Sequence, residues 1–160
     1  MRSLKLRVQK GFTLIELLVV IAIIAILAAV VFVALDPVRR FADARNSTRV
    51  TDVGSILTAI HEYIVDNDGA YPAGLTTSLA EVQLGTGAAG CATTAEGNAC
   101  GATAACLDLS APLATFLITM PEDPQGSAAE TGYSVAVNAN NIVTVRSCDA
   151  ENGSLIQVSR

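Results

Sequence analysis

Apolar positions form one unbroken run near the start of the chain and become periodic further on. From Leu17 to Leu35 every side chain is apolar, and a run of about 18 such residues is enough to span a bilayer. After Asp36-Pro37, apolar residues recur three and four positions apart from Val50 to Ile64, which predicts an amphipathic helix. We expect the proline to bend the helix or to mark the membrane exit rather than to end the helix, because helical periodicity resumes afterwards. One helix should therefore extend from Phe12 to Asn67, roughly 80 Å at 1.5 Å per residue.

The second half of this helix has distinct apolar and polar faces. The apolar face is expected to pack on a folded domain, and the polar face is expected to meet water. Residues 66–69 tolerate a left-handed cap, and Tyr71-Pro72 prevents the helix from continuing. The apolar positions are Val50, Val53, Leu57, Ile60 and Ile64, and the polar positions are Arg49, Asp52, Ser55, Glu62 and Asp66.

The last third of the chain shows the short alternating patterns of β-strands. Tyr133–Val137 and Ile142–Arg146 alternate around the turn residues 138–141, which predicts a hairpin. Leu155–Val158 can add an edge strand. One antiparallel sheet packed against the apolar face of the helix gives an α+β fold.

Two short helices are expected before this hairpin. Ser78–Glu81 has the form of a capping box, and a second helix is expected between Ser110 and Thr119. The turn Pro121–Pro124 stops the second helix, and its acidic residues Glu122 and Asp123 are expected to be solvated. Between the two expected helices, residues 85–105 are rich in Gly, Ala and Thr and would be flexible unless cross-linked.

The charges are distributed unevenly along the chain. Four of the ten basic residues precede Gly11, and no lysine follows Lys10. The part after Gly11 keeps six arginines against 15 acidic residues, a formal charge of −9. This balance argues against nucleic acid as a partner, because binding phosphates requires clustered cations.

Four cysteines follow the apolar run and indicate disulfide bonds. Their spacing lacks the close C-x2-C pairs of a zinc site. Disulfides place the C-terminal domain in an oxidising compartment, and so they orient a span that has basic residues at both ends. Four cysteines permit three connectivities, among which the sequence does not decide. Our preferred pairing is Cys91 with Cys100 and Cys106 with Cys148.

The junction between the basic leader and the apolar run carries the most specific motif. Lys10–Glu16 reads KGFTLIE, in which a basic leader ends in glycine and a phenylalanine and a single carboxylate follow. This junction resembles the processing site of type IV prepilins and pseudopilins, where an inner-membrane aspartic peptidase cuts after the glycine and methylates the new N-terminus. The resemblance implies cleavage between Gly11 and Phe12, N-methylation of Phe12, and retention of the apolar helix.

Glu16 is the only ionisable side chain between Phe12 and Leu35. A charged acid within hydrocarbon costs about 2.5 to 3.5 kcal/mol on insertion scales, so Glu16 requires a partner. The new Phe12 amine lies about 6 Å away along the helix, so a pair within one subunit is possible. The family resemblance instead suggests that Glu16 pairs with the Phe12 amine of a neighbouring subunit.

Three further segments show weaker resemblances to the same family. Tyr63–Pro72 is similar to the end of the long helix in major pseudopilins and short type IVa-like pilins. Pro121–Pro124 looks like the Pro-x-Asp-Pro element that precedes the sheet in pseudopilin-like heads. Asp149, Glu151 and Asn152 resemble a calcium-binding cluster of some pseudopilin heads, with a plain surface loop as the alternative.

The resemblance implies a structural subunit that polymerises with copies of itself into a helical, type IV pilus-like filament. Residues 1–11 would be the cleaved leader, 12–35 the transmembrane half of the helix, 36–69 its amphipathic half, and 70–160 the head. The subunit would be a single-pass protein of the cytoplasmic membrane before it joins an extracellular pilus. Its expected partners are a prepilin peptidase, a membrane assembly platform and minor pilins, and we expect neither a cofactor nor a metal.

Other functions have less support from the residues. The main alternative is the major pseudopilin of a type II secretion or competence system, which forms a short periplasmic filament. A membrane-tethered periplasmic binding module is a more distant one. An enzyme has little support, because the single histidine, His61, lies on a helix flank without a serine or cysteine at motif spacing. Cleavage as an ordinary secretory signal near Ala28 and Ala29 would require an apolar region shorter than the one present.

Overall fold

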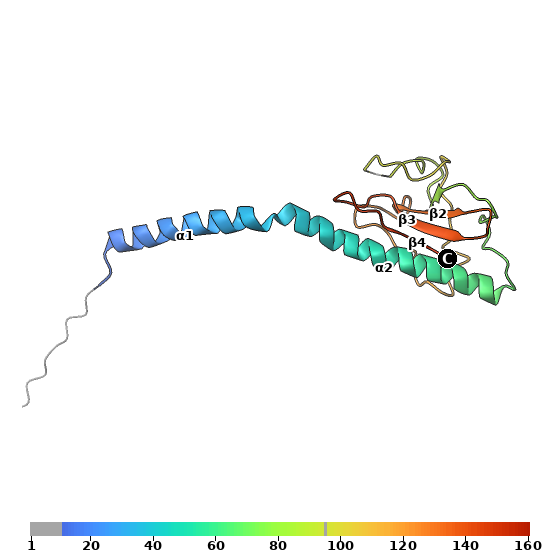
Figure 1. The fold of residues 1–160 in the computed structure, drawn as a ribbon, viewed down its shortest axis with the longest axis horizontal. Helices are drawn as coiled ribbons and strands as arrows, with labels where there is room; N and C mark the ends of the chain where they lie inside the picture. The colour runs from blue at the N-terminus through green and yellow to red at the C-terminus, as the bar shows by residue number, and fades with distance from the viewer. Residues whose placement is uncertain (1–10, 95) are drawn as a thin grey trace, which may run out of the picture. The chain divides into compact units, whose positions relative to one another are not determined.

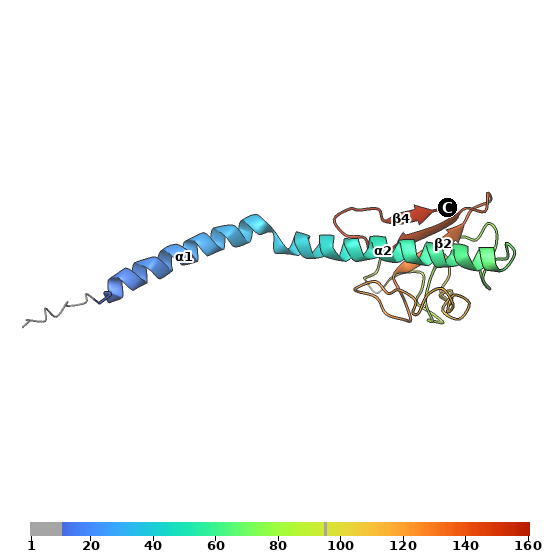
Figure 2. The ribbon, with the colours of Figure 1, turned by 90° about the horizontal axis from the view of Figure 1, so that it is seen from below.

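The computed structural model describes residues 11–94 and 96–160, which divide into two compact units. One unit ends at Val38, and the other comprises Arg39–Arg160. Figures 1 and 2 show the helices and strands in two views. The first unit contains helix α1, and the second contains nearly all of helix α2 and the whole β-sheet.

The predicted helix is confirmed over residues 14–66, with an interruption at one residue. Helix α1 spans Leu14–Leu35 and helix α2 spans Pro37–Asp66. Between them, Asp36 adopts the left-handed conformation with φ 40° and ends α1. Proline disfavours the helical conformation of the residue before it and has no N–H to donate. Pro37 therefore causes the break at Asp36 and is itself well suited to the first position of the next helix.

The sheet has four antiparallel strands in the order β1-β2-β3-β4. Strand β2 has the predicted bounds, and β3 starts and ends one residue later than predicted. Strand β4 starts two residues later and ends one residue later than the predicted edge strand. The hairpin turn forms as expected, because Asn138 Oδ1 accepts hydrogen bonds from the N–H groups of Asn140 and Ile142. The strand bounds are β1 Val82–Gln83, β2 Tyr133–Val137, β3 Val143–Ser147 and β4 Gln157–Ser159.

The hydrophobic core lies between α2 and the sheet. Val53, Ile56 and Ile60 of α2 are fully buried, and strand β2 lies behind the second half of α2 in Figure 2. Val50 is 55% exposed, so the apolar face is centred slightly away from the predicted one. The strand side chains in the core are Tyr133, Val135, Val137, Val143 and Val145.

Three expectations about the second unit are wrong. Ser78 has φ +61°, and Leu79 O accepts a hydrogen bond from Val137 N, so the segment extends the sheet edge instead of forming a helix. Residues 110–116 form turns whose hydrogen bonds span either three or four residues, and no continuous helix results. Arg49 and Asp123, both expected in water, are buried.

Candidate functional site

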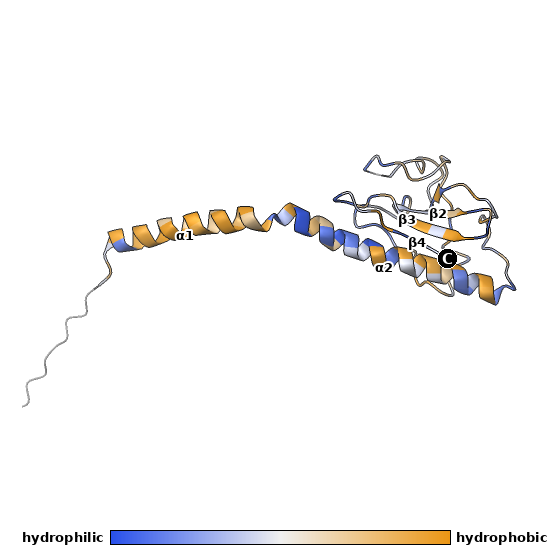
Figure 3. Cartoon of the chain, viewed as in Figure 1, coloured by the Kyte–Doolittle hydropathy of each residue, from blue (hydrophilic) through white to orange (hydrophobic). Residues whose placement is uncertain are grey.

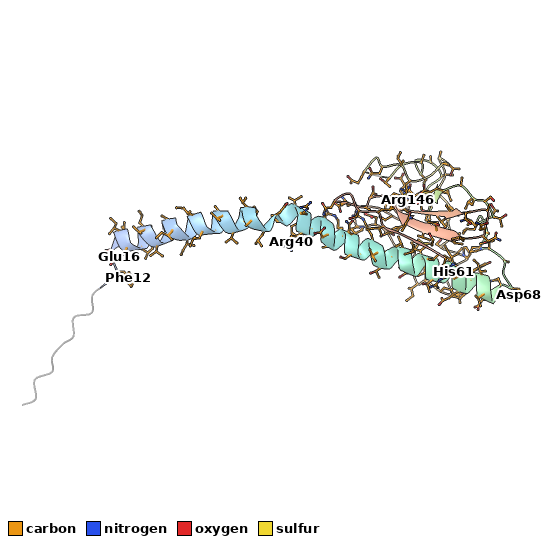
Figure 4. All side chains as sticks on the ribbon, viewed as in Figure 1. Phe12, Glu16, Arg40, His61, Asp68 and Arg146 are labelled. Atoms are coloured by element: carbon orange, nitrogen blue, oxygen red, sulfur yellow. A yellow bond between two sulfur atoms is a disulfide. The ribbon has the colours of Figure 1, made fainter. Side chains whose placement is uncertain are left out.

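The start of α1 brings the predicted processing and assembly residues together. Phe12 is 88% exposed and immediately precedes Thr13, which caps the helix. Glu16 lies in the first turn, and Figure 4 shows it beside Phe12. A Cβ added to Gly11 would have no described neighbouring atom within 4 Å, so the Gly11–Phe12 junction is open. The basic residues before Gly11 lie outside the described residues.

Thr13 and Glu16 form a capping box that satisfies the Glu16 carboxylate. Glu16 Oε2 accepts hydrogen bonds from the backbone N–H of Thr13 at 2.8 Å and from its hydroxyl at 2.7 Å. In return, the N–H of Glu16 donates to Thr13 Oγ1 at 3.3 Å. The carboxylate also lies at the positive end of the helix dipole, which favours its charge. The role of Thr13 was missed from the sequence, although Thr-x-x-Glu before an apolar run is a recognised helix start.

Helix α1 presents an apolar surface that none of the described residues of its own unit covers. None of its 22 residues is buried, and in Figure 3 the α1 ribbon carries the hydrophobic colour along most of its length. At 1.5 Å per residue its length is about 33 Å, close to the hydrocarbon thickness of a bilayer. Among the described residues, it lies in the single stretch long and apolar enough to cross a membrane.

The four cysteines form two disulfides, but not the two that we preferred. Cys91 is bonded to Cys106 and Cys100 to Cys148. The cause lies in the folding of the Gly-rich segment: Thr93 and Ala99 form an antiparallel bridge, and Cys91 N donates to Ala104 O at 2.9 Å. This antiparallel return places Cys91 opposite Cys106 and leaves Cys100 beside the end of β3.

The three calcium candidates belong to one loop but have separate partners: Asp149 bonds to the Gly-rich segment, whereas Glu151 and Asn152 bond to different residues of α2. Asp149 Oδ1 accepts from Thr94 Oγ1 at 2.7 Å and from Asn98 Nδ2 at 2.8 Å. Glu151 accepts hydrogen bonds on both carboxylate oxygens from arginines of α2. Asn152 Nδ2 donates to Asp43 Oδ1 at 2.8 Å.

The remaining candidates for catalysis, His61 and the acidic pair Glu122 and Asp123, lie in different environments. His61 and Phe116 line the same surface pocket, and Nε2 of His61 has no hydrogen-bond partner among the described residues. Asp123 is buried and accepts hydrogen bonds from Arg49, whereas Glu122 is exposed. The burial of Asp123 was missed because its proline turn looks like a surface loop.

A comparison with known families identifies the first part of the chain. Residues 6–32 match the family described as the prokaryotic N-terminal methylation motif. The match covers the end of the basic leader, the Gly11–Phe12 junction and most of α1. No solved structure shows a significant match to the chain.

Proposed function

We propose that this chain, whose residues 6–32 mark it as a precursor of a type IV pilin-like or pseudopilin protein, polymerises into a type IV pilus-like filament. The observation that carries the proposal is α1, which is apolar and exposed along its whole length and has one carboxylate in its first turn. Such a helix requires lipid around it before assembly and other helices afterwards.

Processing would precede assembly. A prepilin peptidase would cut the exposed Gly11–Phe12 bond and methylate the amine of Phe12. The subunit would remain a single-pass protein of the cytoplasmic membrane, with the head in an oxidising compartment. A membrane assembly platform would then move it, with minor pilins, into a filament of identical subunits.

Glu16 would change partners during this process. In the precursor its carboxylate is satisfied by Thr13. After cleavage, the Phe12 amine has an ordinary pKa near 7.7 to 8.0 and stays cationic when methylated. A buried pair between Glu16 and the Phe12 amine of a neighbour would fix the register of the helices, because either charge left alone costs several kcal/mol.

Variants of Glu16 test this step. We expect Glu16→Val and Glu16→Gln to insert and to be cut after Gly11, but to yield few or no filaments. Glu62→Gln, which removes an exposed carboxylate from α2, is the matched control and should assemble normally. Processing is followed by mass spectrometry and filament yield by electron microscopy, in cells without the wild-type subunit. Normal yield from both Glu16 variants would contradict the proposed role.

The resemblance of Tyr63–Pro72 and Pro121–Pro124 to pseudopilin segments supports a second candidate function for this chain. In that case the chain would build a short periplasmic filament of a type II secretion or competence system. Electron microscopy of cells with and without the gene separates the two. Long surface fibres composed of this chain support the pilus, and a secretion defect without such fibres supports the pseudopilus.

A further inference from the structure

The loop between β3 and β4 does not fit the calcium ion that the resemblance to pseudopilin heads suggests. Asp149, Glu151 and Asn152 point to separate partners instead of converging on one point. Calcium takes six to eight oxygen ligands around one centre. Within residues 11–94 and 96–160, no group of three or more His, Cys, Asp or Glu side chains could hold a metal ion.

A side-chain cation lies where this loop meets α2. Arg49 has a side chain that is 0% exposed, and each of its five N–H donors can be assigned a separate oxygen partner. Nε and Nη2 bind the two carboxylate oxygens of Asp123, at 2.5 and 2.9 Å. Nη1 donates to Glu151 Oε2 at 2.7 Å and to Asn46 Oδ1 at 2.9 Å. Nη2 also donates to Gln125 Oε1 at 3.0 Å.

These bonds join three segments that are distant in the sequence. Arg49 and Asn46 belong to α2, Asp123 to the proline turn that Gln125 directly follows, and Glu151 to the β3–β4 loop. Asn46 strengthens the junction, because its Nδ2 donates to Glu151 O and its Oδ1 accepts from Glu151 N. At the edge of the cluster, Arg45 forms a second ion pair with Glu151 at 2.5 Å.

The cost of burying these charges shows which group holds the others in place. A buried carboxylate or guanidinium is tolerated only when it is paired and its remaining hydrogen-bonding groups are satisfied. Arg49 satisfies the carboxylate of Asp123 directly and supplies positive charge to Glu151. Removal of the guanidinium would leave Asp123 as an uncompensated buried charge.

We propose that Arg49 of α2 is the internal cation of the second unit, and that its guanidinium holds the proline turn and the β3–β4 loop on α2 without a bound metal ion. The second unit is therefore indifferent to calcium and depends on this one guanidinium. This inference concerns the second unit alone and holds whether or not the chain forms filaments.

The test uses the full chain purified in detergent, with calcium chloride or with a chelator. Hydrogen exchange of residues 120–125 and 148–156 and the melting temperature are measured for the wild type, Arg49→Gln and Arg146→Gln. We expect the wild type to be identical in both conditions. Arg49→Gln should lose protection in both segments and melt about 10 °C lower or more. Arg146→Gln, which breaks the more exposed pair with Glu81, is the matched control and should change little.

Two results would overturn the proposal. One is calcium binding by the wild type, with increased protection of residues 148–156 when calcium is added. The other is wild-type protection of both segments in Arg49→Gln. If Arg49→Gln does not fold, Glu151→Gln and Asp123→Asn provide the same test, because each should loosen mainly its own segment. Equal protection of the two segments in both of these variants would also contradict the proposal.

Discussion

Gly132 lies where the buried aspartates of two loops meet the start of β2. It has φ +76°, and an added Cβ would stand 2.8 Å from the Cβ of Asp123 and 3.3 Å from Oδ2 of Asp149. Asp123 cannot move away, because Arg49 holds both of its carboxylate oxygens. Both the backbone conformation and the available space therefore favour glycine at this position.

We predict that Gly132→Ala lowers the free energy of unfolding by about 2 to 4 kcal/mol, since it adds overpacking to backbone strain. Gly69→Ala is the control, because Gly69 has a similar φ of +90° and no atom within 4 Å of an added Cβ. It should cost about 1 kcal/mol, the strain alone. Denaturant unfolding measures both, and equal losses would show that contact with Asp123 is not important.

Glu151 makes the stability of the head depend on pH. Hydrogen bonds from Arg45 and then Arg49 lower the pKa of Glu151 to about 2. An unfolded Glu has a pKa near 4.3, so the stabilisation is complete above about pH 5 and is lost as the pH falls towards 2. Because the side chain is 26% exposed, we expect a loss of only about 1 to 2 kcal/mol.

The prediction is checked by unfolding the wild type and Glu151→Gln at several pH values between 7 and about 2. The difference in stability between the two should narrow on acidification, because the variant lacks the titrating group. A constant difference across this range would mean that the pKa of Glu151 is not lowered by the arginines.

At the scale of elements, the two disulfides differ in the length of chain that each closes. Cys91 and Cys106 are 15 residues apart, whereas Cys100 and Cys148 are 48 apart and join the Gly-rich segment to the end of β3. A longer closed loop restricts the unfolded chain more. The second disulfide also fixes the residue directly before Asp149.

Paired serine variants test this difference. Removal of the Cys91–Cys106 bond should cost about 3 kcal/mol and removal of the Cys100–Cys148 bond about 4 kcal/mol, from the loop-closure entropy alone. Thermal unfolding of the two double variants gives the order, and peptide mapping of the wild type gives the connectivity. A map that shows Cys91 joined to Cys100 would contradict the structure.

The elements that the sequence predicted well have a strong local signal. The apolar run fixes α1, and alternation around Asn138–Asn141 fixes the hairpin of β2 and β3. Strand β1 has only two residues, too few to show an alternation of apolar and polar positions, and it forms because it pairs with the edge of β2. The disulfide pairing and the burial of Arg49 depend on contacts 15 to 102 residues apart, which no local pattern encodes.

At the scale of the whole molecule, one chain combines two units with different requirements. The unit that ends at Val38 exposes an apolar helix, and the unit from Arg39 onward has its own core, two disulfides and a buried ion cluster. The first unit therefore depends on its surroundings, and the second supplies its own stability. This division is what a membrane-anchored subunit that later joins a filament requires.

The intact mass of the protein purified from its own cells tests this account most directly. We predict a mature chain that begins at Phe12, carries one methyl group on its amine, and has four hydrogen atoms fewer than the reduced chain because of its two disulfides. An N-terminus within residues 13–35 or beyond Leu35, or an uncut leader, would contradict the prepilin interpretation.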